Sequence, residues 1–466
     1  MPQPTSRAFV VAHSPSLPST CARVRFRDRD VDVDVSAYVL GTAHIGRSSA
    51  TDVARVIREI NPHVVVLELD EERADGLIAR FARDGDGALA SASYGLDLIT
   101  GLREAKRANA LTILGDTRAR SIARDVARAV KEGDWKSLER WRECSTYARD
   151  ALGFGTGRDG RGVNVVGALL ERPEMLAPLV APALAFAGVS VVMASAGATS
   201  SAASVVDLAT FVFAAALFCP IVETLWMARD DVIVENARNG IACAAGIESG
   251  TLRRVRFDFT ADASATLEAA RMFVPRDNET PCFTLKRALA AQEIRRLNLW
   301  EPRWLALMDS LAEANGGALE GAELGCLLGR SRHYCRRESD SIGDDDVDVL
   351  ARTGTVVVEN KMRRARVIRS AEGQRPTTRA RKLEVWIEGL DEEIDVFGLE
   401  SHPAGYLLAS GAPSKGNINA GDGDDVLGVK AASGDSESRV PTEIRCVCVV
   451  GLAHVNGVRR RLLAGS

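Results

Sequence analysis

Two short segments far apart in the chain end in the same pattern and carry histidines that could do chemistry. Residues 38–44 read Y-V-L-G-T-A-H, and residues 449–454 read V-V-G-L-A-H. In each segment an apolar run typical of a buried strand leads to a glycine, where the backbone can turn sharply, and a histidine follows three residues later. We therefore expect His44 and His454 at strand ends, where two imidazoles could serve one site. Two unrelated strand ends with surface histidines would give the same pattern.

A carboxylate is predicted at the same edge by the β-α-β unit that follows the first histidine. Residues 53–60 carry apolar side chains at helical spacing, and residues 64–69 read V-V-V-L-E-L, which is typical of a central parallel strand with Glu68 as its one charge. Parallel strands open their carboxyl ends on one edge of a sheet, so Glu68 should lie near His44. An unpaired buried carboxylate costs on the order of several kcal/mol. Its partner could be a neighbouring arginine such as Arg73 or a metal ion.

A second acidic residue is expected at this edge. Residues 111–114 form a third apolar run, and Gly115 and Asp116 follow it directly. Asp116 is the candidate general base of the site, and a helix cap or a salt bridge is the structural alternative for the same residue.

The composition is that of a globular protein in a reducing compartment. A chain of 466 residues is too long for one ordinary core, so we expect one large elaborated domain or two domains with insertions. The net charge is −4 and the basic residues are scattered, which gives no reason to expect nucleic acid as a partner. The nine cysteines include no C-x-x-C pair. Cys446 and Cys448 share one face of a predicted strand, and we interpret them as buried thiols rather than zinc ligands.

The middle of the chain is unusually apolar. Residues 175–206 contain no charged side chain, and residues 208–228 contain only Glu223. Each stretch is long enough to cross a bilayer by the roughly 20-residue criterion, so we expect a transmembrane helical hairpin. Arg172 and Arg229 flank the pair on one side, as the positive-inside tendency asks. A buried helical hairpin of a globular domain is the alternative.

These patterns divide the chain into six parts. They are a flexible segment over 1–36, which resembles a transit peptide or is an untargeted tail; the first α/β half over 37–173; the apolar hairpin over 174–228; a helical region over 229–335, with helices at 263–273 and 283–297; an insertion over 336–440, with strands at 355–358 and 383–387 and disordered linkers; and a last strand with the second histidine over 441–466.

Four motifs in this order resemble the TraB family, which includes PrgY-like proteins and is similar to the TIKI metalloproteases. The matching pieces are G-T-A-H at 41–44, L-E-L-D-E-E-R at 67–73, L-G-D at 114–116 and G-L-A-H-V-N-G at 451–457. The resemblance covers residues 37–150 and the last 25 residues. It implies a central, largely parallel sheet with helices on both faces.

The resemblance also implies a metal-dependent site with His44, Glu68 and His454 as ligands. Arg73 matches the family's arginine after the E-L-x motif. The chain departs from the family where G-D-R becomes G-D-T-R, which displaces Arg118 by one residue. The family's E-R-D element corresponds to 229–230 or to 276–277, and neither pair keeps the glutamate.

The sequence therefore predicts an α/β protein that acts as a membrane-associated hydrolase with a divalent metal ion (Mn, Co or Zn). Peptides or proteins are the expected substrates, and the membrane of an intracellular organelle, such as a mitochondrion or chloroplast, is the expected location. Glu68, Asp116 and Arg73 are the expected catalytic residues. The competing interpretation is a non-catalytic membrane-associated regulator or adaptor that keeps the TraB fold.

Overall fold

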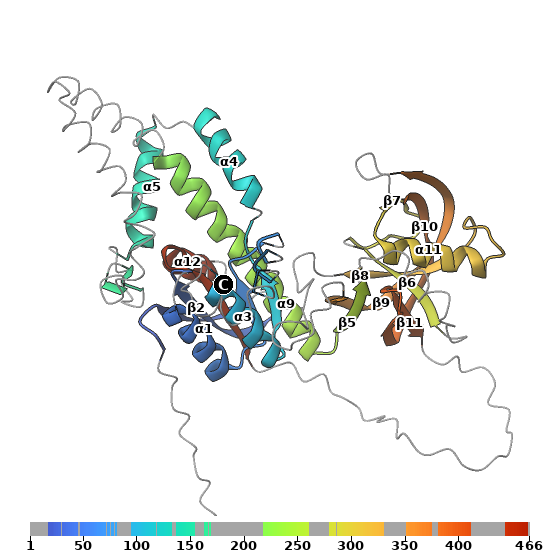
Figure 1. Cartoon of the computed structure of the whole chain (residues 1–466), viewed down its shortest axis with the longest axis horizontal. Coiled ribbons are helices and arrows are strands. Elements are labelled where there is room, and N and C mark those ends of the chain that lie inside the picture. The colour runs from blue at the N-terminus through green and yellow to red at the C-terminus, as the bar shows by residue number, and fades with distance from the viewer. Residues whose placement is uncertain are drawn as a thin grey trace, which may run out of the picture.

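Two sheets with flanking helices make up this α/β protein (Figure 1). The structure, a computed structural model, describes residues 17–28, 30–44, 47–70, 72–74, 76–78, 80–81, 95–117, 119–132, 137–153, 163–165, 167–168, 218–260, 279–285, 287–329, 351–374, 381–411 and 443–464.

The first sheet has the order β1-β2-β12-β3-β4. Its strands are β1 (Cys21–Asp28), β2 (Val33–Thr42), β3 (Val64–Leu67), β4 (Leu111–Leu114) and β12 (Ile444–Gly451). The edge strand β1 is antiparallel to β2, and the other four strands are parallel. The last strand in sequence therefore lies in the middle of the sheet, between two strands from the start of the chain.

Helices cover both faces of the first sheet, and this explains why its central strands are apolar throughout. On one face, α1 (Arg47–Ile60) and α3 (Leu96–Arg107) pack against Val447 and Val449 of β12. On the other face, α9 (Ala228–Glu248) and α12 (Val455–Ala464) pack against Cys446 and Cys448. Alternate residues of β12 thus enter opposite cores. The two thiols are free and fully buried, as the sequence predicts, with their sulfurs 3.8 Å apart.

The described end of the expected apolar hairpin belongs to the packed fold. Residues 218–221 are helical and continue through a π-helical turn, η2 (Val222–Met227), into α9. Glu223, the one charge of the apolar stretch, accepts two hydrogen bonds from Arg140 of α5 (Leu138–Ala151). Helix α4 (Ala119–Glu132) lies between β4 and α5 in the sequence.

The expectation of a transmembrane helix is corrected by this structure. Over the ranges that it describes, no helix is both long enough and apolar enough to cross a bilayer. Residues 218–228 lead into α9, which carries Arg229, Asp230 and Asp231 in its first turn. This end of the apolar stretch is therefore part of the α/β domain. Residues 174–217 of the expected hairpin lie outside the described residues.

The second sheet forms a separate domain over residues 252–411. Its strands, in the order β5-β9-β8-β6-β11-β10-β7, are β5 (Leu252–Thr260), β6 (Glu279–Leu285), β7 (Ile294–Leu299), β8 (Glu323–Gly329), β9 (Ala351–Gln374), β10 (Arg381–Ser401) and β11 (Leu407–Gly411), with one helix, α11 (Pro302–Ala314). Because β9 also pairs with β10, five of these strands close into a ring around an apolar interior. We call this unit the second domain.

The second domain replaces much of what the sequence predicts for the same residues. The helical region expected over 229–335 is confirmed only for α9 and α11, because the same range also holds β5, β6, β7 and β8. The helix expected over 283–297 is two strands, and the one over 263–273 lies outside the described residues. The short strands expected at 355–358 and 383–387 are parts of β9 and β10. At the amino end, β1 shows that the flexible segment expected over 1–36 does not extend to residue 36.

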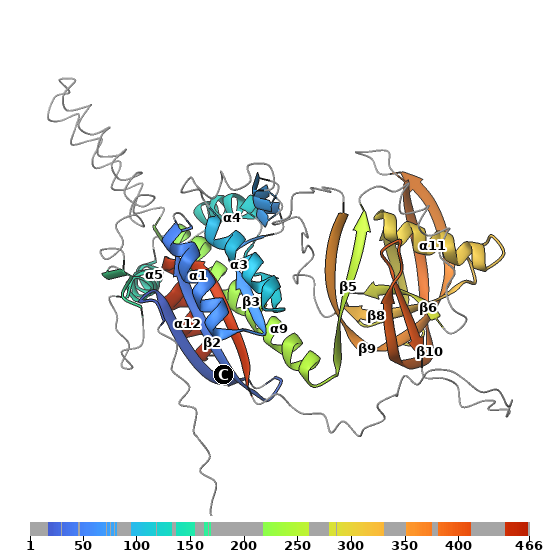
Figure 2. The ribbon, with the colours of Figure 1, turned by 60° about the horizontal axis from the view of Figure 1, so that its bottom comes forward.

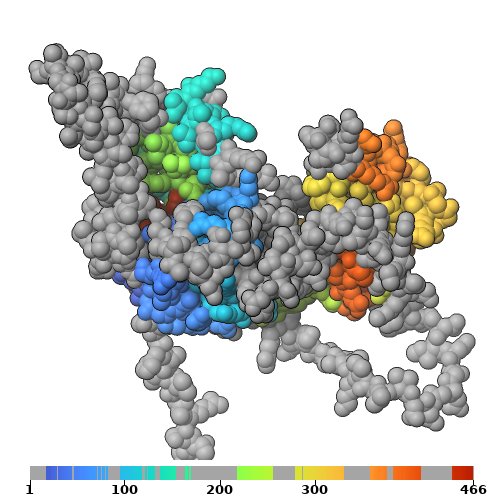
Figure 3. Space-filling view, in the orientation of Figure 1, coloured from blue at the N-terminus to red at the C-terminus, as the bar shows by residue number. Residues whose placement is uncertain are grey.

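The site predicted from the sequence and the second domain lie at opposite ends of α9 (Figures 1 and 2). The helix begins beside the carboxyl ends of the parallel strands, and its last residues lead into β5. Its 21 residues correspond to a rise of about 30 Å. In the space-filling view, the blue atoms of the first sheet and the yellow and orange atoms of the second domain form separate groups (Figure 3). The second domain therefore approaches the sheet from the edge away from the two histidines.

Candidate active site

The two G-x-x-H motifs meet because their strands are neighbours. Strands β2 and β12 pair in parallel with Gly41 opposite Val450 and Thr42 opposite Gly451. A Cβ on Gly41 would lie 2.6 Å from side-chain atoms of Leu452 and Val455, so this glycine lets the turn after β12 pack over the end of β2. The structure thus confirms that both histidines lie at the carboxyl edge of one sheet.

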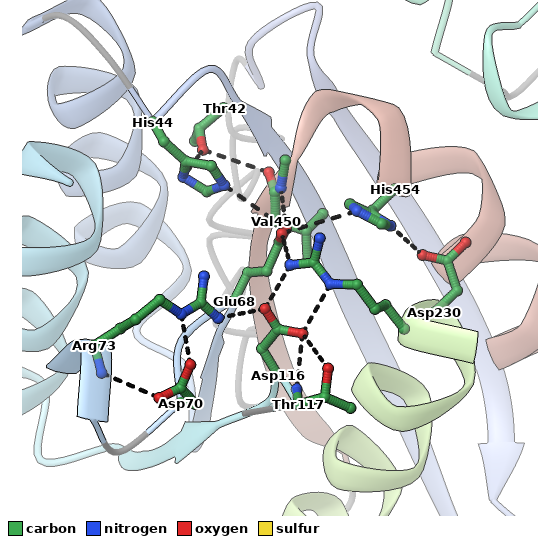
Figure 4. Close-up of polar contacts among 12 residues, drawn as sticks. Thr42, His44, Glu68, Asp70, Arg73, Asp116, Thr117, Asp230, Val450 and His454 are labelled. Atoms are coloured by element: carbon green, nitrogen blue, oxygen red, sulfur yellow. Dashed lines mark hydrogen bonds and ion pairs between the residues drawn. The ribbon is translucent and has the colours of Figure 1, made fainter. Parts of the chain in front are cut away.

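Glu68 lies between the two histidines (Figure 4). It follows β3 directly, and its backbone N–H still donates to Val449 of the neighbouring β12. Its Oε2 is 3.7 Å from Nε2 of His44, and its Oε1 is 3.8 Å from Nε2 of His454. The backbone N–H of Gly451 donates to Oε2. Three groups from three adjacent strands therefore converge, as the parallel topology predicts.

Each histidine uses its other ring nitrogen to bind a buried aspartate. Nδ1 of His44 is 3.0 Å from Oδ2 of Asp97, and Nδ1 of His454 is 2.6 Å from Oδ1 of Asp230. An ionised carboxylate only accepts hydrogen bonds, so each Nδ1 is the donor. Both Nε2 atoms are thereby directed toward Glu68. A carboxylate that orients the far nitrogen of a histidine is a common second contact of metal-binding imidazoles.

Arg229 supplies a fixed positive charge beside Glu68. Its Nη2 donates to Oε1 of Glu68 and to Asp116, and its Nε is 2.9 Å from Oδ1 of Asp116. The π-helical turn directly before α9 adds a residue to the helical repeat just ahead of this arginine, a feature often found near functional sites. The sequence offered two candidate Arg-Asp pairs, at 229–230 and at 276–277. Of these, Arg229 and Asp230 contact Glu68 and His454.

Asp116 reaches the expected edge but is held by arginines rather than directed at the histidines. Besides Arg229, it accepts from Arg73, and its Oδ1 accepts the backbone N–H of Thr117 at 2.8 Å. Arg73 also donates to Oδ2 of Asp70 at 2.6 Å. These contacts match the structural alternative for Asp116, that of a cap and ion-pair partner. Asp116 holds Arg229 in place, and Arg73 holds Asp116.

Electrostatics link the protonation of the three central groups. Burial opposes ionisation of Glu68, but His454, His44 and Arg229 outweigh it and hold the pKa of this carboxyl well below its usual range. Burial likewise favours neutral imidazoles, yet Asp97 and Glu68 raise the pKa of His44 well above its ordinary value, and Glu68 and Asp230 raise that of His454. The carboxylates of the cluster therefore stabilise positive charge on the two imidazole rings.

Gly451 lies next to all three groups. Gly451 has φ −57° and ψ 144°, a conformation open to any residue, so the backbone does not require a glycine here. A Cβ at this position would lie 3.3 Å from Oε2 of Glu68, 3.4 Å from Nε2 of His44 and 3.5 Å from Cδ2 of His454. Glycine at this position keeps a point between the three side chains free of protein atoms.

The residue types at this edge are suitable ligands for a divalent cation, although the side chains do not lie at metal-binding distances from one common point. Two imidazole nitrogens, a carboxylate and an open point beside Gly451 are the groups that catalytic metal sites use. Within the described ranges, however, no three His, Cys, Asp or Glu side chains are close enough to hold an ion as they stand. One oxygen of Glu68 is instead held in an ion pair with Arg229.

Sequence reasoning missed Asp97, and it named Arg229 and Asp230 only as one of two candidate pairs. The available signal was the acidic residue in the otherwise apolar run L-D-L-I at 96–99, and the Arg-Asp pair after the apolar stretch. Two other histidines serve elsewhere: Nδ1 of His63 accepts the backbone N–H of Arg445, and His402 lies in the second domain.

Comparison with known protein families finds no match to this chain, and no curated protein matches it significantly.

Proposed function

We propose that this protein is a metal-dependent hydrolase whose centre is formed by His44, Glu68 and His454. The observation that carries the proposal is that two imidazole Nε2 atoms face one carboxylate while each Nδ1 is held by a buried aspartate. Because each aspartate holds the Nδ1 proton, both Nε2 atoms can donate electron pairs toward the same region once a cation displaces the second proton of each ring. Carboxylates outnumber arginines in the ion-pair network of that region, which favours a cation: Glu68, Asp70, Asp97, Asp116 and Asp230 belong to it, against Arg73, Arg229 and Arg461.

The residues of the site divide the work of hydrolysis between them. When bound, a divalent cation would lower the pKa of a water molecule and polarise a substrate carbonyl. His44, His454 and Glu68 would hold it, with Mn, Co or Zn as the candidates. Arg229 places a fixed positive charge beside Glu68, suited to the negative charge that develops on a carbonyl oxygen. Arg73 and Asp116 hold Arg229 in place. Peptide bonds are the proposed substrate class.

The resemblance to the TraB family supports the same assignment. Its two G-x-x-H motifs and its E-L-x element come from three strands that are adjacent here, in the order β2-β12-β3. Most of the chain separates the two G-x-x-H motifs in sequence, and the pairing of β2 with β12 brings them to one edge of the sheet. A TraB-like fold for the first sheet and its helices is part of this proposal.

Metal binding is the measurement that tests the proposal. Purified full-length protein, stripped with chelator, is titrated calorimetrically with Mn²⁺, Co²⁺ and Zn²⁺, and its metal content is determined after dialysis. We expect one ion per chain, with loss of binding in His44→Ala and in His454→Ala. The control is His63→Ala, which removes an imidazole from the opposite edge of the sheet and should bind as the wild type does. No binding by the wild type, or equal binding by all variants, would refute the metal.

Hydrolysis is then tested with the metal-loaded protein. A library of peptides is incubated with wild type and with Glu68→Gln, and new termini are identified by mass spectrometry. Cleavage that needs added metal and is absent in Glu68→Gln would support the enzyme.

One observation favours a non-catalytic alternative. Arg229 already neutralises one oxygen of Glu68, and no formed ligand cluster exists among the residues that the structure covers. In a regulator or adaptor, the ion pair between Arg229 and Glu68 would serve only to hold α9 against β3. The titration separates the two functions, because such a protein would bind no cation at this place.

A further inference from the structure

His44 has a backbone conformation that needs support from its surroundings. Its φ is 56°, in the left-handed region that residues other than glycine rarely adopt. Such conformations cost free energy and persist only where neighbouring contacts hold them, often at functional sites. The histidine is thus turned back over the end of β2, so that its ring faces the carboxyl edge of β12.

The start of helix α3 supplies that support at two points. The backbone N–H of Gly95 donates to the carbonyl of His44 at 2.8 Å. Gly95 caps the helix with φ 87°, and two residues later Asp97 contacts Nδ1 of the His44 ring at 3.0 Å. One short segment therefore holds both the backbone and the side chain of the histidine.

Asp97 is a poor residue for stability alone. It is 1% exposed, and within the described part of the chain its Oδ1 accepts no hydrogen bond. On the same helix, Glu104 is also buried but is paired with both Arg58 and Arg107. A buried carboxylate with so few partners costs free energy, since desolvation is repaid only by good contacts. The buried position of Asp97 brings its carboxylate into contact with the ring of His44.

We propose that Asp97 is the positioning residue of His44. It fixes Nδ1 as the protonated nitrogen, so that Nε2 faces Glu68 and the open point beside Gly451. Asp230 has the same relation to His454 from the opposite face of the sheet, and the two helices α3 and α9 thereby set the two rings independently. The inference rests on the proposed function only for its consequence, which is that Nε2 of each ring is the nitrogen that would lose its proton to bind a cation.

The proton on Nδ1 is observed directly by nuclear magnetic resonance of the full-length, ¹⁵N-histidine-labelled protein. We expect a downfield, slowly exchanging Nδ1–H signal, assigned to His44 by its absence in His44→Ala. In Asp97→Asn the signal should vanish or shift strongly and exchange faster. In Glu104→Gln, which alters the other buried carboxylate of α3, it should be unchanged. The other neighbour of Nδ1, the Thr42 hydroxyl at 3.2 Å, should not replace Asp97.

The wild-type spectrum decides the matter even if Asp97→Asn does not fold. A His44 ring that carries no proton on Nδ1 would overturn the proposal, as would a signal that Asp97→Asn leaves unchanged. Cation affinity gives a second measurement: loss of such an orienting partner typically weakens metal binding by about 10–100-fold. If the wild type binds no cation, the proposed function fails while the Nδ1–H signal still tests the role of Asp97.

Discussion

Gly457 lies directly against the carboxylate of Asp230. A Cβ on this glycine would be 1.8 Å from Oδ2 of Asp230 and 2.4 Å from the hydroxyl of Tyr147, which donates to the same carboxylate. Helix α12 can therefore approach α9 at this point only because residue 457 has no side chain. The final glycine of G-L-A-H-V-N-G thus makes room for the aspartate that binds His454.

Gly457→Ala is expected to destabilise the protein although it lies in a helix. Alanine normally favours an exposed helix interior by about 1 kcal/mol over glycine, but overpacking a close contact costs about 1–3 kcal/mol. The clash should win because both neighbouring atoms belong to a buried hydrogen-bonded pair. Urea unfolding of wild type and variant measures the difference. The control is Gly76→Ala, in a helical segment where an added Cβ meets nothing within 4 Å. An unchanged unfolding midpoint in Gly457→Ala would contradict the packing described here.

Gly451→Ala should separate the site from the fold. Alanine adopts the backbone angles of Gly451 without strain, and its methyl group would lie 3.3–3.5 Å from the three central side chains, so the unfolding midpoint should change little. The methyl group would fill the point between them, and we expect at least about a tenfold loss of cation affinity because ligands at roughly 2 Å can no longer close on an ion. Calorimetric titration measures it. Wild-type affinity in this variant would place the cation elsewhere.

Arg229→Gln removes one partner of a buried ion-pair cluster. We expect a loss of about 3 kcal/mol in the free energy of unfolding, since Glu68 and Asp116 are left with uncompensated charge. Added Mn²⁺ should restore more stability to this variant than to the wild type, because Glu68 is no longer shared with a guanidinium group. Arg140→Gln is the control: it breaks the pair with Glu223 outside the site, and Mn²⁺ should not restore its stability. Equal effects of Mn²⁺ on both variants would refute competition for Glu68.

Cation binding should release protons. The pKa of each site histidine is raised in the folded protein, so each ring keeps its second proton to a higher pH than a free histidine does, and a cation must displace that proton. Stability from these protonated rings is present below the ordinary pKa of histidine and is lost as pH rises through the folded value. Titration in buffers of different ionisation enthalpy should show release of up to about two protons per ion at pH 7. Binding without any proton release would mean that these rings are not the ligands.

His402 should make the second domain sensitive to acid. Burial lowers the pKa of His402 from 6.5 to about 4, and its Nδ1 accepts the backbone N–H of Ala404 at 3.0 Å while the ring stacks on Tyr406. Between these two pH values the unfolded chain takes up a proton that the folded chain refuses, so stability falls as pH drops from about 6.5 to 4. His402→Asn keeps an acceptor but does not titrate. Urea unfolding should show a shallower pH dependence for this variant, and identical profiles would exclude His402 as the cause.

The arrangement of the first sheet could be predicted because its signals are local. Apolar runs followed by Gly-x-x-His or by Glu68 define strand ends, and parallel topology then requires that His44 and Glu68 share an edge. The partners of the histidines could not be predicted in the same way. Asp97 and Asp230 are acidic residues in first turns of helices, a common position, and only tertiary packing turns their carboxylates inward.

The second domain shows where periodicity fails. Residues 283–297 carry apolar side chains at spacings that suit a helix, yet they form β6 and β7, because pairing with β8, β10 and β11 outweighs local preference. The sequence pattern predicts only short apolar segments of the long strands β9 and β10. Their outer faces are rich in charge, as with Arg366 and Glu384, which hides the alternation expected of a strand.

The central position of β12 also sets an order of events during synthesis. Strands β2 and β3 have no direct pairing with each other in the finished sheet, since β12 lies between them. A ribosome adding about 5–20 residues per second needs tens of seconds to pass from β3 to β12. For that time β2 can pair only with β1 and β3 only with β4, while the whole second domain emerges and can fold. The convergence of His44, Glu68 and His454 is therefore completed only after the second domain has emerged, because His454 follows β12.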